Sequence, residues 1–78
     1  MTTYELAISI PKEKRKQLAE AGLLPPRVER DIHVYELFQS LLSEGRSKMD
    51  AYITVGQKCF TSEENLRKII RKMSAEVR

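Results

Sequence analysis

The sequence predicts a mainly α-helical fold: a short N-terminal β-strand, then about four helices, the last three forming a bundle. Three observations predict it. Apolar residues recur at helical spacing beyond residue 26, residues 4–10 alternate instead, and Pro and Gly stand where helices would begin and end. At 78 residues we expect a single domain with a thin core. Within it, residues 1–24 would form a strand–helix arm and residues 26–78 the helical bundle.

The first expected element is a strand over residues 4–10. Tyr4, Leu6, Ile8 and Ile10 occupy alternate positions, which is the period of a half-buried strand. A lone strand leaves its backbone groups unpaired, and no second strand is evident in the chain. We therefore expect it to pair with the same strand of a second copy, which would make the protein a homodimer.

A helix over about residues 11–21 follows, with Pro11 at its first position. The segment Ile8-Ser9-Ile10-Pro11-Lys12-Glu13 resembles the start of ribbon-helix-helix repressors, whose dimeric ribbon enters the major groove. The outward residues here, Glu5, Ala7 and Ser9, are not side chains that reach base edges. A dimeric repressor of this kind is an alternative, but we expect the strand to serve dimerisation rather than DNA reading.

The next helix is expected from Pro26 to near Glu44, after Gly22 has ended the preceding helix. Its apolar stripe comprises Val28, Ile32, Val34, Tyr35, Leu37, Phe38, Leu41 and Leu42. The first turn carries both signs of charge, which predicts an ordinary solvated surface. These charged residues are Arg27, Glu29, Arg30 and Asp31.

Two further helices are expected over residues 48–59 and from near Ser62 to the end of the chain. Gly45 can stop the helix before them, and Ser47 is a candidate cap for the first. Thr61 with Glu64 three residues later predicts a capping box for the second. Small residues on the first would let another helix approach closely; these are Ala51 and Gly56. The apolar stripe of the second comprises Leu66, Ile69, Ile70, Met73 and Val77.

The last helix also predicts a cationic face. Arg67, Lys68, Arg71 and Lys72 lie between the apolar positions, which places about four positive charges over roughly two turns. Such a face suits phosphates.

Residues 51–70, AYITVGQKCFTSEENLRKII, resemble the helix-turn-helix of bacterial and phage homeodomain-like DNA-binding proteins. The resemblance covers about residues 32–73. Matching positions are the small Ala51, the inner-face Val55 and Gly56, Ser62 at the start of the recognition helix, and Leu66, Ile69 and Ile70 on its buried side. Where the family prefers Gly or a small polar residue in the turn, this chain has Phe60. The resemblance implies a helix-turn-helix bundle that binds double-stranded DNA.

On this interpretation the protein is a transcriptional regulator or a mobile-element accessory factor. Thr61 and Ser62, at the start of the recognition helix, suit phosphate contacts through their hydroxyl and amide groups. Asn65, Lys68 and Glu64 suit base edges, and the other cations suit the flanking backbone. The candidate DNA-binding residues are Thr61, Ser62, Glu64, Asn65, Arg67, Lys68, Arg71, Lys72, Lys48 and Lys58.

An alternative is a protein-interaction module that does not bind nucleic acid. Its cationic helix would meet an acidic partner or only solvent. Glu63, Glu64 and a formal net charge of only +3 favour this alternative.

Residues that would indicate an enzyme are not found in the sequence. His33 is the only His and Cys59 the only Cys, so no zinc-ligand spacing exists, and there is no Gly-rich phosphate loop. We expect no catalysis, no metal and no cofactor, with His33 partly exposed and Cys59 facing inward. Without a signal-peptide-like start or an apolar run of membrane-span length, we expect a soluble, cytoplasmic protein that does not bind membranes.

Overall fold

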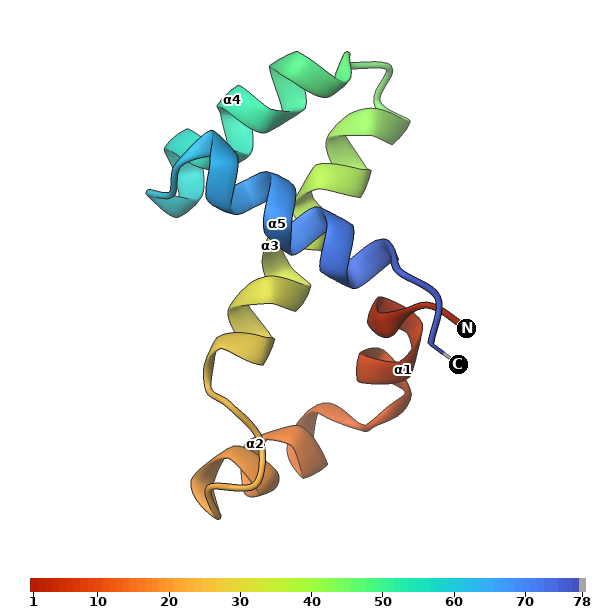
Figure 1. The fold of residues 1–78 in the computed structure, drawn as a ribbon, viewed down its shortest axis with the longest axis vertical. Coiled ribbons are helices and arrows are strands. Elements are labelled where there is room, and N and C mark those ends of the chain that lie inside the picture. Colours follow the sequence, from red (N-terminus) through yellow and green to blue (C-terminus); the bar gives the residue numbers. More distant parts are fainter. Residues whose placement is uncertain (78) are drawn as a thin grey trace.

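The computed structural model describes residues 1–77, and these form five helices without a sheet (Figure 1). The helices are α1 (Thr3–Ser9), α2 (Lys12–Glu20), α3 (Arg27–Ser43), α4 (Lys48–Cys59) and α5 (Glu63–Ser74). Helix α3 runs along the long axis, α4 packs against its C-terminal part, α5 crosses it near the middle, and α1 and α2 lie toward its N-terminal end. The mainly helical prediction is confirmed, and α2 to α4 start and end close to the predicted residues. Helix α5 starts as predicted but ends at Ser74, before the predicted end, because residues 75–77 leave the helix to pair with the start of the chain.

The predicted N-terminal strand is wrong, because residues 3–9 form α1. The Thr2 hydroxyl accepts from the Glu5 amide at 3.1 Å and the Glu5 carboxylate accepts from the Thr2 amide at 2.9 Å, which is a capping box. Tyr4 and Ala7, three residues apart, pack on the core. Leu6 and Ile8, which the strand would place beside Tyr4, are each 44% exposed. Without a strand there is no ribbon, so the ribbon-helix-helix alternative is wrong as well.

The start of the chain pairs with the end of the same chain, and the two termini lie together in Figure 1. The Thr3 amide donates to the Ala75 carbonyl and the Val77 amide to the Met1 carbonyl, both at 2.9 Å, around an antiparallel bridge between Thr2 and Glu76. The expected homodimer depended on unpaired strand groups at this end. Residues 3–9 form a helix and residues 1 and 3 bond to the end of the same chain, so the strand on which that expectation depended is absent from residues 1–77.

The core lies where α3, α4 and α5 meet. Its buried members are Ile32, Val34, Phe38, Leu41, Ala51, Val55, Leu66, Ile69 and Met73. The predicted apolar stripes of α3 and α5 supply most of them, whereas Val77 lies beyond the end of α5 and is 42% exposed. The core therefore fixes which side of α5 faces outward.

Most of the predicted helix ends are confirmed. Gly22 and Gly45 have φ angles of 78° and 92°, the left-handed conformation that suits glycine after a helix. The Ser47 hydroxyl accepts from the Asp50 amide at the start of α4. At α5 the cap is Ser62, whose hydroxyl accepts from the Asn65 amide, so the predicted Thr61 capping box is wrong.

The turn between α4 and α5 is tight. Phe60 has φ 52°, and the amides of Phe60 and Thr61 donate to the Gly56 carbonyl. A Cβ atom on Gly56 would lie 3.1 Å from the Thr61 carbonyl oxygen and 3.5 Å from the Leu66 side chain of α5, so a larger residue here would require the turn to shift slightly. This confirms the expectation that Gly56 permits close approach.

Candidate nucleic-acid interface

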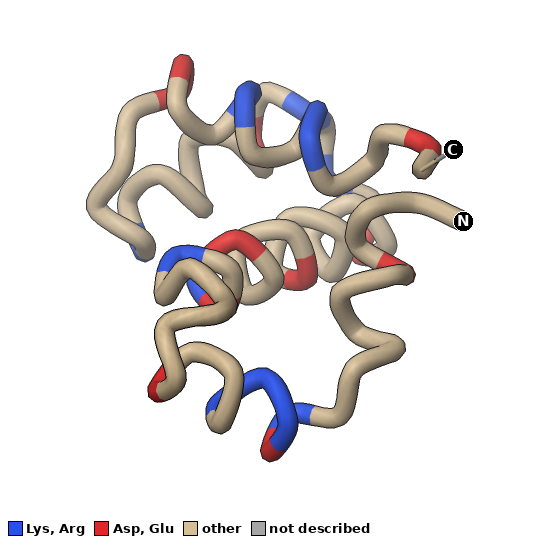
Figure 2. The backbone as a smooth tube through the Cα atoms, turned by 60° about the horizontal axis from the view of Figure 1, so that its bottom comes forward, with Lys and Arg blue, Asp and Glu red and all other residues tan. Residues whose placement is uncertain are grey.

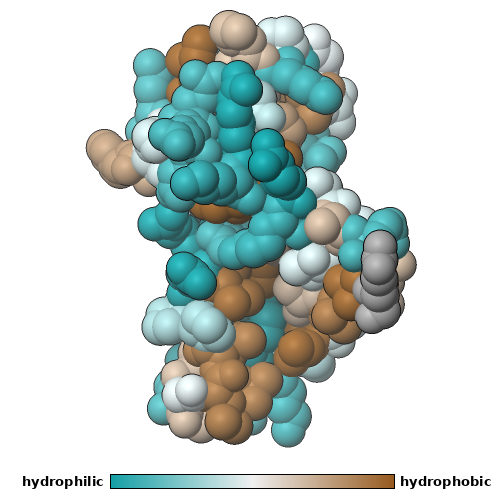
Figure 3. Space-filling model, viewed as in Figure 1, coloured by the Kyte–Doolittle hydropathy of each residue, from teal (hydrophilic) through white to brown (hydrophobic). Residues whose placement is uncertain are grey.

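The outer face of α5 is polar. At about 100° per residue, the buried Leu66, Ile69 and Met73 leave the opposite side of the helix to Glu64, Lys68 and Arg71. The last three are exposed, and hydrophilic side chains cover much of the face of the molecule on which α5 lies (Figure 3). The backbone positions of Lys and Arg are concentrated on α5 and on α2 (Figure 2).

On the edge of this face that lies beside α4, Arg67 is held by contacts within the protein. The Arg67 guanidinium lies 2.8 Å from Glu63 Oε1, one turn earlier on the same helix. It also stacks over the Tyr52 ring, 5.3 Å from the ring centroid. Arg67 is therefore held by its own protein, with part of its charge balanced.

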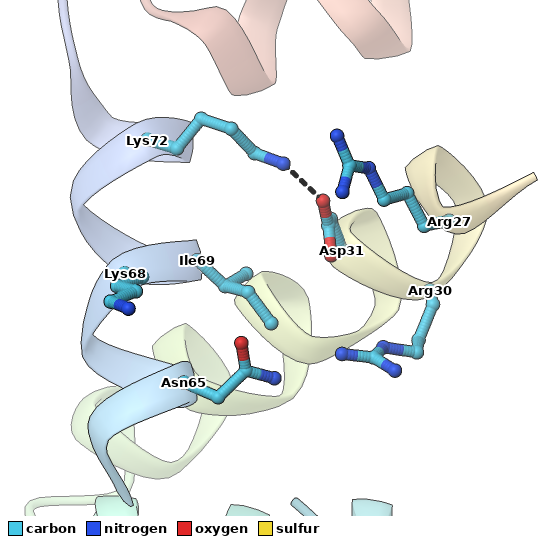
Figure 4. A pocket seen from close by; sticks show the side chains of 7 residues that line it. All are labelled: Arg27, Arg30, Asp31, Asn65, Lys68, Ile69 and Lys72. Carbon is cyan, nitrogen blue, oxygen red and sulfur yellow. Dashed lines mark hydrogen bonds and ion pairs between the residues drawn. The ribbon is translucent and has the colours of Figure 1, made fainter. Parts of the chain in front are cut away.

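The opposite edge faces the N-terminal turn of α3. There Lys72 Nζ pairs with the Asp31 carboxylate, a side chain that is only 4% exposed (Figure 4). Asn65 Nδ2 donates to the Thr61 hydroxyl at 2.7 Å, which fixes the orientation of the Asn65 amide. Two of the four predicted cations of α5, Arg67 and Lys72, are thus engaged within the protein.

The other cations of the predicted site have no ion-pair partner among residues 1–77. Lys68 and Arg71 lie on the outer face of α5, and Lys48 and Lys58 are exposed on α4. Lys48 and Lys58 are about 15 Å apart along the axis of α4, since an α-helix rises 1.5 Å per residue. They therefore do not form one cluster, and the central pair on α5 is Lys68 and Arg71.

A cleft between α3 and α5 was not evident from the sequence. It has a volume of about 300 Å³ and is lined by Arg27, Arg30, Asp31, Asn65, Lys68, Ile69 and Lys72 (Figure 4). Three of the four first-turn charges of α3, predicted to be ordinary surface, lie here beside α5, whereas Glu29 pairs with Arg15 of α2. One signal for them was present in the sequence: a cation in the first turn of a helix opposes the helix dipole and calls for another explanation.

The remaining candidate residues lie elsewhere. His33 is exposed on α3, and Cys59 is partly buried against the core, as expected. Within the described chain, no group of three or more His, Cys, Asp or Glu side chains could hold a metal ion. None of the helices over residues 1–77 is long and apolar enough to cross a membrane. Comparisons of the chain with protein-family models, curated proteins and solved structures found no match.

Proposed function

We propose that this is a small DNA-binding protein of the helix-turn-helix type, with α5 as its recognition helix. Helices α4 and α5 are joined by residues 60–62, and both pack on α3. The left-handed Phe60 supports the resemblance to homeodomain-like proteins, because its backbone conformation is the one that Gly adopts without strain. A regulator of transcription or an accessory factor of a mobile element is the cellular role that this activity suggests.

One observation carries the proposal: α5 projects Lys68 and Arg71 from its outer face, and neither pairs with an acid in residues 1–77. An α-helix fits the major groove of B-DNA, where Lys can donate to guanine and Asn to adenine. Lys68 and Asn65 would therefore meet base edges. Arg71 would meet the backbone, and the Ser62 end of α5 presents its amide groups to phosphate.

A salt titration on random-sequence duplex, read by fluorescence anisotropy, tests this. The protein should bind at low salt, and the logarithm of the binding constant should fall linearly with the logarithm of the salt concentration. Arg71→Gln should lower the slope by about 0.9 for a lost phosphate contact, and Lys68→Gln should weaken binding through a lost contact to a base edge. Lys14→Gln is the matched control, because Lys14 is exposed on α2, away from α5, and has no ion pair in the described residues. A parent protein that ignores duplex would refute the proposal.

A second candidate function is protein binding without nucleic acid. Three apolar side chains of the α4 region are exposed: Met49 at 63%, Ile53 at 53% and Phe60 at 95%. Exposed apolar groups of this size favour a protein contact. In that case the duplex titration should show no binding even at low salt. Polyglutamate, as a model of an acidic partner, should bind the cationic side of α5.

A further inference from the structure

We infer that the cleft between α3 and α5 receives the DNA backbone, with Arg27 and Arg30 binding phosphate beside the recognition helix. This inference rests on the proposed DNA binding and names two contact residues that lie outside the helix-turn-helix segment. Both arginines belong to α3, more than 30 residues before α5 in the chain, so the site exists only through packing of the two helices.

The charge of the cleft is concentrated and unbalanced. It is lined by four basic side chains and one carboxylate, which leaves three net positive charges, as many as the formal charge of the whole chain. Asp31 and Lys72 neutralise each other. Arg27, Arg30 and Lys68 then remain without an acidic partner in residues 1–77. Cations that line one cleft repel one another, and a bound anion would relieve this repulsion.

Folding alone does not favour arginines at this place. Arg27 is the first residue of α3 and Arg30 lies one turn further, where the helix dipole presents its positive end. The cap residue, Pro26, makes no side-chain hydrogen bond to offset the exposed amides. An acidic residue would stabilise this turn better than either arginine. The cations therefore fit a negatively charged ligand rather than a stabilising role.

The shape of the cleft suits phosphate. Guanidinium groups donate two parallel hydrogen bonds to phosphate oxygens, and Figure 4 shows Arg30 extending from α3 toward α5. The acidic group in the cleft is shielded, since the Asp31 side chain is only 4% exposed and accepts from Lys72. A volume of about 300 Å³ equals that of roughly ten water molecules. This leaves room for a phosphate group with its nearest water.

The position of the cleft favours duplex backbone over a free ion. Asn65 and Lys72 lie on the edge of α5 that faces α3, and Lys68 lies between this edge and the outer face of Glu64 and Arg71. A helix in the major groove has base edges in front of it and sugar–phosphate strands at its sides. With the outer face toward the bases, the two arginines of α3 beside this edge would meet one of those strands.

The test compares two variants that remove equal charge. Arg27→Gln/Arg30→Gln should lower the salt slope of duplex binding by about two units, as expected for two lost phosphate contacts. Its melting temperature should stay the same or rise, because repulsion at the start of α3 is relieved. Lys14→Gln/Lys16→Gln on α2 is the control; both lysines are exposed and unpaired within residues 1–77, and its slope should match the parent.

The outcomes separate the two proposals. A parent protein that does not bind duplex at low salt, or that binds only polyglutamate, overturns the proposed function and this inference together. A parent that binds, with an unchanged slope in the α3 double variant, overturns the inference alone. Arg27→Lys/Arg30→Lys keeps both charges and should retain most of the slope. If it binds as weakly as the Gln variant, the arginines act through structure, and the inference is overturned.

Discussion

Replacing Asp31 with Asn should affect stability and DNA binding in opposite directions. The Asp31 carboxylate is buried, accepts from Lys72, and supplies the negative charge in the cleft between α3 and α5. Asn has nearly the same shape, so the packing of α3 on α5 should persist. The change removes one charge and frees one lysine.

The loss of stability should be modest. A hydrogen bond to a charged group contributes about 1.5–3 kcal/mol to stability. Two effects make the loss smaller here. Lys72 is 49% exposed, so its released ammonium group is hydrated by water, and the variant avoids the cost of burying the Asp31 carboxylate. We expect a net loss of about 1 kcal/mol. For a chain of this size that lowers the melting temperature by roughly 4–8 °C.

The gain in binding follows from charge. A carboxylate about 8 Å from a phosphate in water repels it by roughly 0.5 kcal/mol, so its removal should tighten binding about two-fold at low salt. If the released Lys72 then pairs with a phosphate, the salt slope should steepen by about 0.9. A less stable protein would thus bind duplex more tightly.

Thermal melts by circular dichroism and anisotropy titrations measure both effects on the same samples. Lys72→Gln is the informative counterpart, because it leaves the buried Asp31 carboxylate unpaired and removes a cation from the cleft. It should destabilise the fold at least as much, yet weaken binding. If both variants change affinity in the same direction, the cleft does not meet DNA and the reasoning is refuted.

Three further predictions concern the fold. Ile69→Ala should cost about 2–5 kcal/mol, because this residue is 5% exposed in the core; a melting point within about a degree of the parent would contradict the orientation of α5. Phe60→Gly should stabilise by about 0.5–1 kcal/mol in urea unfolding, since it relieves a left-handed φ of 52° and removes a side chain that is 95% exposed, whereas Phe60→Val should destabilise. The hydrogen bond that Tyr4 donates to Glu36 raises the pKa of Tyr4, so its stabilisation is complete below the ordinary tyrosine value and is lost as pH rises through the raised one. Tyr4→Phe should therefore lose less stability than the parent in melts between about pH 9 and 11, and equal losses would contradict the role of this contact.

The helices of the C-terminal half could be predicted because their local signals agree with one another. The apolar repeat, the Ser47 cap and Gly45 all indicate the same boundaries for α3 and α4. The site residues on α5 followed from the same repeat, since an inward stripe fixes the outward face. Their place on an exposed face was therefore predictable without knowing what they contact.

The N-terminal segment could not be predicted in the same way. Apolar side chains at alternate positions over seven residues favour a strand, although Tyr4, Ala7 and Ile8 also have the spacing of one helical face. Contacts across the fold decide: the Tyr4 ring lies 4.8 Å from that of Tyr35, and the backbone of residue 3 bonds to that of Ala75. At α5, the sequence offers two adjacent hydroxyl residues as caps, Thr61 and Ser62. The turn that contains the left-handed Phe60 places Ser62 at the cap position.

The cationic surface differs from the predicted stripe in how its charge is arranged. Of the four cations on α5, Arg67 pairs with Glu63 and Lys72 with Asp31, so only Lys68 and Arg71 retain unbalanced charge within residues 1–77. Arg27 and Arg30 of α3 add two such charges beside Lys68. The count of available cations is again four, but they extend across two helices instead of along one. Charges spread across the width of the surface match a groove bordered by phosphates better than a single row does, and this arrangement depends on the packing of α3 against α5.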